Sequence, residues 1–275
     1  MGFHRPDRIE DALAALASGA SVIAGGTDWY PSRGDGPVPM NVLDVTRLQG
    51  FRGITRDGAG WRIGAATTWT DIARADLPPA FDGLKRAARE VGGLQIQNAG
   101  TLGGNLCNAS PAADGMPPLL TLDPKVELIG PHGAREVPLA DFVTGPRQAD
   151  LREGELLAAL HIPDPGPSAG GFIKLGARKY LVISIAMVAA LVHVEGGRVA
   201  WARVAVGACS PVARRLSALE ADLQGVAVNA LAGAVRPDHL KDLSPIGDVR
   251  GSAGYRLDAV AELVGRAIAQ AARGA

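Results

Sequence analysis

The chain has 275 residues, of which 47% are hydrophobic and 20% charged, and its formal net charge at pH 7 is zero. This balance is typical of a globular protein with enough length for one or two cores, and it gives no indication of a nucleic acid or an anionic membrane as a partner. Two cysteines without a C-x-x-C spacing exclude a disulfide framework and argue against an iron–sulfur or zinc site. No signal region or membrane-spanning run is visible, so we expect a cytoplasmic location.

The first fifty residues predict a small α/β lobe. Residues 7–10 form a capping-box pattern, and the helix that follows has one apolar face and ends at Gly19. Strands are predicted over 21–23 and 41–45. The helical face consists of Ile9, Leu13 and Leu16.

A second lobe begins at about residue 51. Residues 57–60 predict a hairpin turn, and Thr68 or Thr70 can cap a helix that runs through Arg74. Further helices are predicted over 80–90 and near 118–122, and further strands over 126–129 and 155–162.

Residues 163–171 are rich in helix and strand breakers and mark the clearest boundary in the chain. Beyond it, β-rich runs over 183–195 and 198–208 are joined by Gly196-Gly197, a hairpin turn by type. Helices are predicted over 212–223, 228–235 and 255–272. We therefore expect an α+β domain here, with an antiparallel sheet and helices on one face.

The stretch 98–115 has neither helical nor strand periodicity. Gly103 and Gly104, beside Thr101 and Asn105, predict a loop whose free N–H groups point at one spot and bind an anion. By itself such a glycine cluster is also compatible with an ordinary surface turn.

A second glycine run, residues 24–28, directly follows the predicted strand 21–23. Two loops with exposed N–H groups could hold the two phosphates of a dinucleotide from opposite sides. The chain contains neither the G-x-G-x-x-G fingerprint nor a P-loop, so the ligand is bound by another scheme.

The chain shows no catalytic or metal-binding constellation. Its histidines lack the spacing of metal ligands, and the G-x-S-x-G pattern is absent. Cys107 has no neighbouring cation in the sequence to lower its pKa, which favours a buried packing role. The histidines are His4, His132, His161, His193 and His239.

Ala24-Gly25-Gly26-Thr27-Asp28, together with Gly100-Thr101-Leu102-Gly103-Gly104-Asn105-Leu106 and Asn108-Ala109-Ser110-Pro111-Ala112-Ala113-Asp114, resembles the paired FAD-binding motifs of the molybdenum hydroxylase flavoproteins. This family includes the medium subunit of carbon monoxide dehydrogenase and the FAD domain of xanthine dehydrogenase. The resemblance implies a two-lobed FAD-binding domain of the p-cresol methylhydroxylase type over 1–165, with lobes at about 1–50 and 51–165. It also implies a carbon monoxide dehydrogenase flavoprotein-type α+β domain over 170–275.

The resemblance also implies roles in FAD binding for single residues. The backbone of Ala24 to Thr27 cradles the pyrophosphate, next to Asp28, and Asn108 contacts the phosphates. Asp114 lies at the ribityl or flavin side, Leu157 touches the isoalloxazine with its backbone, and Lys174 lies near the pyrimidine ring, although the sequence alone favours an edge-strand lysine there. The residues that complete the pyrophosphate cradle are Thr101, Gly103, Gly104 and Asn105.

The implied function is electron transfer, since redox chemistry belongs to the flavin and no catalytic side chain is then needed. FAD would take electrons from a 2Fe–2S partner subunit beside a large molybdenum-cofactor subunit and pass them to an external acceptor. Tyr180-Leu181-Val182 stands where xanthine dehydrogenases carry acidic residues, which puts NAD in doubt as that acceptor. The alternatives are a self-contained flavin oxidase or reductase and a nucleotide-binding scaffold subunit without flavin.

Overall fold

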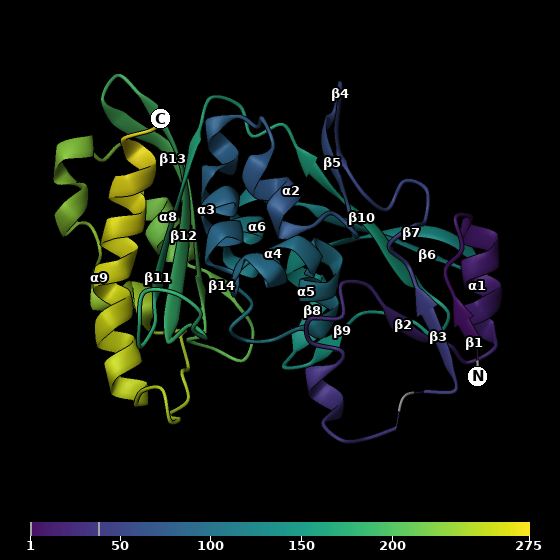
Figure 1. Ribbon diagram of the computed structural model, residues 1–275. Coiled ribbons are helices and arrows are strands. Elements are labelled where there is room, and N and C mark those ends of the chain that lie inside the picture. The colour runs from purple at the N-terminus through teal and green to yellow at the C-terminus, as the bar shows by residue number, and fades with distance from the viewer. Residues whose placement is uncertain (1, 38) are drawn as a thin grey trace.

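A computed structural model describes residues 2–37 and 39–275. The three larger sheets lie side by side in Figure 1, with the small N-terminal one at one end and the C-terminal one at the other. In the described residues, no helix combines the length and the apolar character needed to span a bilayer.

The N-terminal lobe is a three-stranded parallel sheet, ordered β1-β3-β2, with one helix. The predicted helix and both predicted strands are confirmed, but the capping box is wrong. The helix begins after Arg8, whose side chain has no acceptor that could cap it, and the Asp7 carboxylate pairs with Arg47 instead. The elements are β1 (Gly2–His4), α1 (Ile9–Ala17), β2 (Ser21–Ile23), the 3₁₀ helix η1 (Pro31–Arg33) and β3 (Asn41–Asp44).

The second lobe is built on an antiparallel five-stranded sheet, ordered β4-β5-β10-β6-β7, beside a two-stranded ribbon. The predicted hairpin at residues 57–60 and the strands over 126–129 and 155–162 are confirmed, while β7 carries no clear sequence signal. The strands are β4 (Ile54–Asp57), β5 (Gly60–Gly64), β6 (Lys125–Gly130), β7 (Gly133–Pro138) and β10 (Leu156–Pro163), and the ribbon is β8 (Val143–Gly145) with β9 (Gln148–Ala149).

Six α-helices cover this lobe, and Thr68 caps the first of them with a capping box. The helices predicted over 80–90 and near 118–122 are confirmed, the former after a 3₁₀ turn. The helices are α2 (Trp69–Arg74), α3 (Asp82–Glu90), α4 (Leu94–Ala99), α5 (Leu102–Asn108), α6 (Met116–Leu122) and α7 (Leu139–Phe142), with η2 (Pro79–Phe81) before α3.

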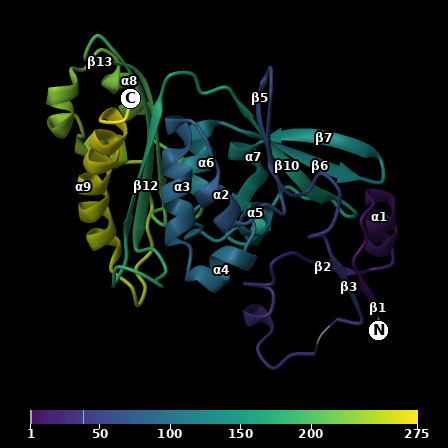
Figure 2. The ribbon, with the colours of Figure 1, turned by 45° about the horizontal axis from the view of Figure 1, so that its top comes forward.

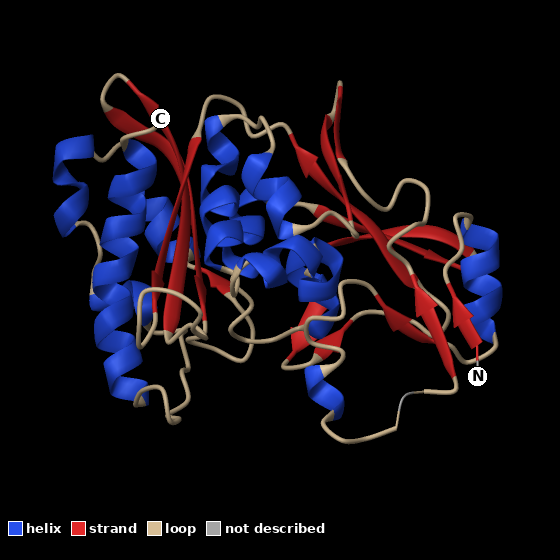
Figure 3. Ribbon diagram, viewed as in Figure 1, coloured by secondary structure: helices blue, strands red, loops and turns tan. Residues whose placement is uncertain are grey.

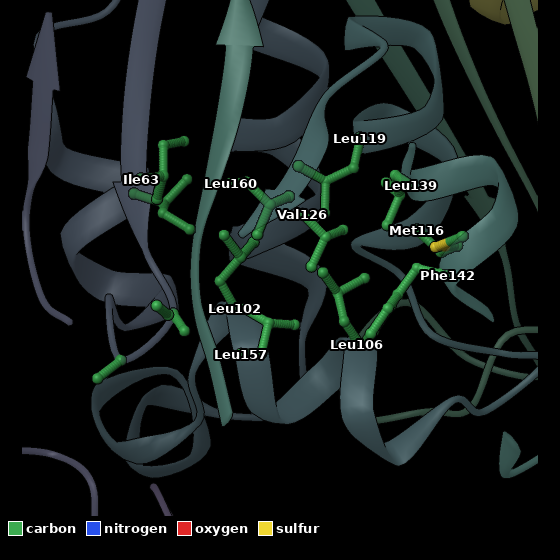
Figure 4. Packing of buried hydrophobic residues seen from close by; sticks show 14 of the residues in the cluster. Ile63, Leu102, Leu106, Met116, Leu119, Val126, Leu139, Phe142, Leu157 and Leu160 are labelled. Atoms are coloured by element: carbon green, nitrogen blue, oxygen red, sulfur yellow. The ribbon is translucent and has the colours of Figure 1, made fainter. Parts of the chain in front are cut away.

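The structure corrects the prediction of a loop over 98–115, because α4 ends within this stretch and α5 lies inside it. The Thr101 side chain caps α5 by accepting the Gly104 N–H, so two glycines are tolerated in the first turn. Leu102 and Leu106, four residues apart, form its buried face (Figure 4). Two leucines are too few to produce a visible periodicity in the sequence.

The C-terminal part is a four-stranded antiparallel sheet, ordered β11-β12-β13-β14. Gly196 and Gly197, both with positive φ, form the predicted hairpin turn between β12 and β13. The helix predicted from residue 212 begins only at Ser217, because residues 214–215 pair with β13. The elements are β11 (Ala169–Leu175), β12 (Ala186–Glu195), β13 (Arg198–Gly207), β14 (Arg214–Arg215), α8 (Ser217–Leu223), η3 (Val228–Gly233), η4 (Pro237–Leu240) and α9 (Ala253–Ala272).

Both faces of this C-terminal sheet are covered. Along β12, Ala186 and Val188 pack with the apolar face of α9, whereas Met187 and Ala189 pack with Ala87 of α3. Figure 2 shows α9 on one side of β12 and α3 and α6 on the other. Figure 3, in the view of Figure 1, shows helices between the two larger sheets at the place of α3 and α6. The predicted helices therefore cover one face, and helices from before residue 163 cover the second.

Candidate functional site

The two glycine motifs meet in space. A Cβ atom built on Gly25 would lie 1.7 Å from the Ala99 carbonyl oxygen and 2.9 Å from the Gly100 nitrogen. A Cβ on Gly100 would lie 3.3 Å from the Thr27 hydroxyl oxygen. Glycine is required at residue 25 because the two backbones approach each other so closely. The motifs are therefore the two sides of one junction between the lobes.

A cleft with a volume of about 480 Å³ opens at this junction. Its size is in the range of small-molecule and cofactor sites. Of the residues that the resemblance assigns to FAD binding, all except Asp114 and Lys174 line it, namely Ala24, Gly25, Gly26, Thr27, Asp28, Thr101, Gly103, Gly104, Asn105, Asn108 and Leu157.

The first motif supplies free backbone donors. In the part of the chain that the structure describes, the N–H groups of residues 25–28 take part in no hydrogen bond. They follow directly on β2, so the end of that strand carries them to the cleft. Unpaired N–H groups at a cleft wall suit an anionic oxygen such as that of a phosphate.

The second motif differs from the prediction of free donors. The Leu102 N–H donates to the Thr67 carbonyl (3.0 Å), the Gly103 N–H donates to the Ala65 carbonyl (2.8 Å), and the Gly104 N–H donates to the Thr101 hydroxyl. These bonds fix α5 to the strand end at Ala65. Gly103 allows α5 to pack closely on Ala65, because a Cβ on Gly103 would lie 2.7 Å from that residue. Gly104 leaves the cleft beside α5 open to a ligand, because a Cβ there would meet only the Thr101 hydroxyl.

Polar side chains of α5 complete this wall. The Asn105 Oδ1 atom is buried and finds no hydrogen-bond partner among the described residues. The Asn108 Oδ1 atom accepts a hydrogen bond from Arg147. Cys107 is exposed and lines the cleft, which corrects the predicted packing role. The reason is helical geometry, because Leu102 and Leu106 occupy the buried face of this short helix and Cys107 does not.

Another part of the cleft wall is held by a network of charges. The Arg135 guanidinium on β7 donates two hydrogen bonds to the Glu155 carboxylate, at 2.7 and 2.8 Å, and others to Asp150. These bonds hold the pKa of Glu155 at about 2 and raise that of Arg135. The segment between Asp150 and Leu157 is thereby fastened to β7, and it places Leu151, Glu155, Leu156 and Leu157 in the cleft wall.

Asp114 and Lys174 lie outside the residues that line the cleft and bind each other. Lys174 Nζ lies 2.6 Å from Asp114 Oδ2 and also donates to the Glu90 carbonyl, and the Ser184 hydroxyl donates to Asp114 Oδ1. Burial raises the pKa of Asp114, and the ammonium group and the hydroxyl act against that rise. This ion pair joins β11 to the segment before α6.

Several residues that line the cleft were not singled out from the sequence. Trp29 directly follows the first motif, and its position there was the one signal that could have pointed to it. Phe51, Trp69, Val91 and Ile96 lie in no motif and reach the cleft only through the fold. Within residues 2–37 and 39–275, no three His, Cys, Asp or Glu side chains gather as a metal site would require.

Two family models match the chain. Residues 1–165 match the FAD binding domain in molybdopterin dehydrogenase. Residues 172–271 match the CO dehydrogenase flavoprotein C-terminal domain.

Individual relatives agree with these matches. The chain is 32% identical over 278 residues to the putative xanthine dehydrogenase FAD-binding subunit of Escherichia coli (strain K12), covering 98% of this chain and 95% of the relative. It is 27% identical to the carbon monoxide dehydrogenase medium chain of Hydrogenophaga pseudoflava, covering 97% and 95%. The structure is similar, with a TM-score of 0.91 and 29% identity, to a chain of the reconstituted CO dehydrogenase from Oligotropha carboxidovorans, covering 100% of this chain and 98% of that one.

Proposed function

We propose, from the premise that this chain belongs to the FAD-binding family of molybdopterin dehydrogenases, that it is the electron-transfer subunit of a cytoplasmic molybdenum hydroxylase complex. Its FAD takes electrons from the iron–sulfur clusters of a partner subunit and passes them to an external acceptor. We assign residues 1–165 to FAD binding and residues 170–275 to the C-terminal domain. The observation that carries the proposal is the single cleft in which both glycine motifs meet.

The residues of the cleft fit FAD. Free N–H groups at residues 25–28 suit the pyrophosphate oxygens, and the partnerless Asn105 Oδ1 atom can accept a hydrogen bond from a ligand hydroxyl. Gly104 leaves room for a ligand to approach α5 closely. Bound FAD supplies the redox chemistry, which is why the chain needs no catalytic side chain of its own.

In this assignment the protein binds and orients the cofactor. The loop Ala24–Asp28 holds the pyrophosphate from the N-terminal lobe, and Thr101, Gly103, Gly104, Asn105 and Asn108 face it from α5 and its cap. Leu157 contacts the cofactor with its backbone. Asp114 and Lys174 do not line the cleft themselves; we assign their ion pair to the flavin side, because Lys174 binds the Glu90 carbonyl next to Val91 of the cleft wall.

The partners we propose are a 2Fe–2S subunit and a large molybdenum-cofactor subunit. Support comes from the names of relatives, which include the medium chains of carbon monoxide dehydrogenase and glyceraldehyde dehydrogenase. A chain whose sequence shows no catalytic constellation suits a component that relays electrons and does not touch the organic substrate.

The test of FAD binding is Gly104→Val. A valine Cβ here would lie 2.9 Å from the Thr101 hydroxyl and the side chain would narrow the cleft beside α5, so we expect the purified variant to lose its bound FAD and its visible flavin absorbance. The matched control is Gly265→Val on α9, where a Cβ meets no atom within 4 Å. This control should keep its FAD. Unchanged absorbance in Gly104→Val would refute the assignment of the cleft.

The alternatives predict other outcomes of the same purification. A scaffold subunit would be colourless and unchanged by added FAD. A self-contained oxidase or reductase would turn over a simple substrate in air without its partners.

The acceptor is a second point of the proposal. Tyr180 and Leu181 are exposed and follow β11, and Leu181 has a φ of +54°. This segment carries no acidic side chain, which by the family resemblance is the kind of group that nicotinamide binding uses. We expect the assembled complex, supplied with substrate, to reduce NAD much more slowly than an artificial dye. Comparable rates would contradict this expectation.

A further inference from the structure

Trp29 is fixed on several sides at the wall of the cleft. Its indole N–H donates to the Ser21 hydroxyl (3.2 Å), and the Trp29 and Tyr30 rings lie nearly perpendicular to each other with centroids 4.9 Å apart. The Arg33 guanidinium carbon lies 3.9 Å from the centre of the Trp29 ring. A half-buried tryptophan that is held by a hydrogen bond, a ring edge and a cation has little freedom to turn away.

One face of this indole is available to a ligand. Trp29 and Ser32 line the cleft, whereas Arg33 does not. The guanidinium occupies one face of the ring, and the opposite face is the one that we assign to a ligand in the cleft. Nothing in the fit of the phosphates or in the electron-transfer role requires an aromatic ring at this position.

We infer that Trp29, backed by Arg33, is the platform on which the adenine ring of FAD stacks. This inference rests on the proposed function and deepens it, because it assigns a subsite that discriminates FAD from flavins without adenine. Every base has a π-face, and stacking on an aromatic side chain is a general way to bind one.

The position of Trp29 favours adenine over the flavin ring. The free N–H groups of residues 25–28, which we assign to the phosphates, come immediately before Trp29 in the chain. A ring stacked on Trp29 would therefore be separated from the phosphates by no more than the length of one nucleoside, as adenine is in FAD. Trp29 is hydrogen-bonded to Ser21 at the start of β2, on the N-terminal lobe. Thr27, in contrast, lies against Gly100 at the end of α4, on the second lobe. Lys174, assigned to the flavin side, binds the Glu90 carbonyl next to Val91, which also lines the cleft. The two rings of FAD then occupy separate parts of the cleft.

The experiment measures the affinities of the full-length apo chain for FAD, FMN and ADP, by flavin fluorescence for the first two and by displacement of FAD for ADP. In Trp29→Leu we expect the affinities for FAD and ADP to fall about tenfold and that for FMN to stay within about twofold. Trp29→Phe keeps a ring, and we expect it to retain most of the affinity for FAD.

The outcomes separate the inference from the proposed function. Equal losses of FAD and FMN affinity, or no loss of either, would overturn the adenine platform while FAD binding by the chain stands. A wild-type chain that binds neither FAD nor ADP would overturn both. If circular dichroism shows that Trp29→Leu does not fold, Arg33→Met takes its place, with an expected loss of about threefold for FAD and ADP alone.

Discussion

At the scale of single residues, the cleft depends on charges that are fixed before any cofactor arrives. The Glu155 side chain is only 9% exposed and accepts two hydrogen bonds from Arg135 and one from the Arg152 N–H. Charge-assisted hydrogen bonds of this kind are stronger than neutral ones and hold both groups in one geometry. Glu155 thus serves to position the wall that carries Leu156 and Leu157.

This network predicts a pH dependence of stability. The pKa of Glu155 falls from its ordinary 4.5 to about 2 in the folded chain, mainly through the bonds from Arg135. Its contribution is therefore present above about pH 4.5 and is lost as the pH falls toward 2. We expect Glu155→Gln to be less stable by about 2 kcal/mol at neutral pH, with the difference shrinking between these two pH values.

Urea unfolding of both proteins at a series of pH values measures the difference. The control is Glu262→Gln, since Glu262 is exposed and pairs with Arg266 on the surface of α9. A difference that stays constant from neutral pH to pH 2 would contradict the role of the Glu155 carboxylate.

At the scale of elements, the position of α5 determines where the second glycine motif lies relative to the first. Its seven residues are held by the Thr101 cap, by two bonds to the backbone at Ala65 and Thr67, and by Leu102 and Leu106 in the core. A helix this short is not stable by itself, so its position comes from these tertiary contacts.

Thr101→Val tests that dependence, because valine keeps the volume of this buried side chain and removes only the hydroxyl. We expect the loss of the cap to cost about 1 kcal/mol of unfolding free energy and to weaken FAD binding as well, since Gly104 and Asn105 shift with the first turn. Ser252→Ala removes the corresponding cap of α9, far from the cleft in the sequence and outside its lining. It should lower stability without weakening FAD binding; an equal weakening in both variants would contradict the prediction.

At the scale of the whole molecule, the C-terminal sheet packs on the FAD-binding part through apolar side chains, and the buried ion pair of Lys174 with Asp114 joins the two. The side chains of Lys174 and Asp114 are 5% and 10% exposed, and 60 residues of chain separate them. Ser184, at the far end of the segment after β11, binds the same carboxylate. One acidic residue therefore fastens both ends of the segment that carries Tyr180 and Leu181.

Removing one partner of this pair should be costly, because it leaves the other charge buried without compensation. We expect Lys174→Met to lower the free energy of unfolding by about 3 kcal/mol, and the double variant with Asp114→Asn to recover much of that loss. Thermal or urea unfolding of the apo chain measures both. The control is Lys125→Met, since the pair of Lys125 with Glu136 is exposed. A double variant no more stable than Lys174→Met would show that the pair does not act as a unit.

Much of the fold was predictable because its signals are local. The strand before the first glycine run, the hairpin at Gly196-Gly197 and the apolar stripe of α9 each depend on residues close together in the chain. The helical stretches near 98–108 escaped detection, because the Thr101 cap and two buried leucines are too sparse a pattern to recognise without the core that they pack against.

The candidate site divides in the same way. The sequence by itself determined which backbone segments are rich in glycine, and therefore where a cofactor could approach. Only the tertiary structure decided that Gly25 packs against Ala99 and that Lys174 forms an ion pair with Asp114. It also decided that the N–H groups of the second motif donate hydrogen bonds within the protein and are not free for a ligand. The physical reason is that free donors, close backbone approach and buried charge pairs are properties of neighbours in space, which the chain brings together only on folding.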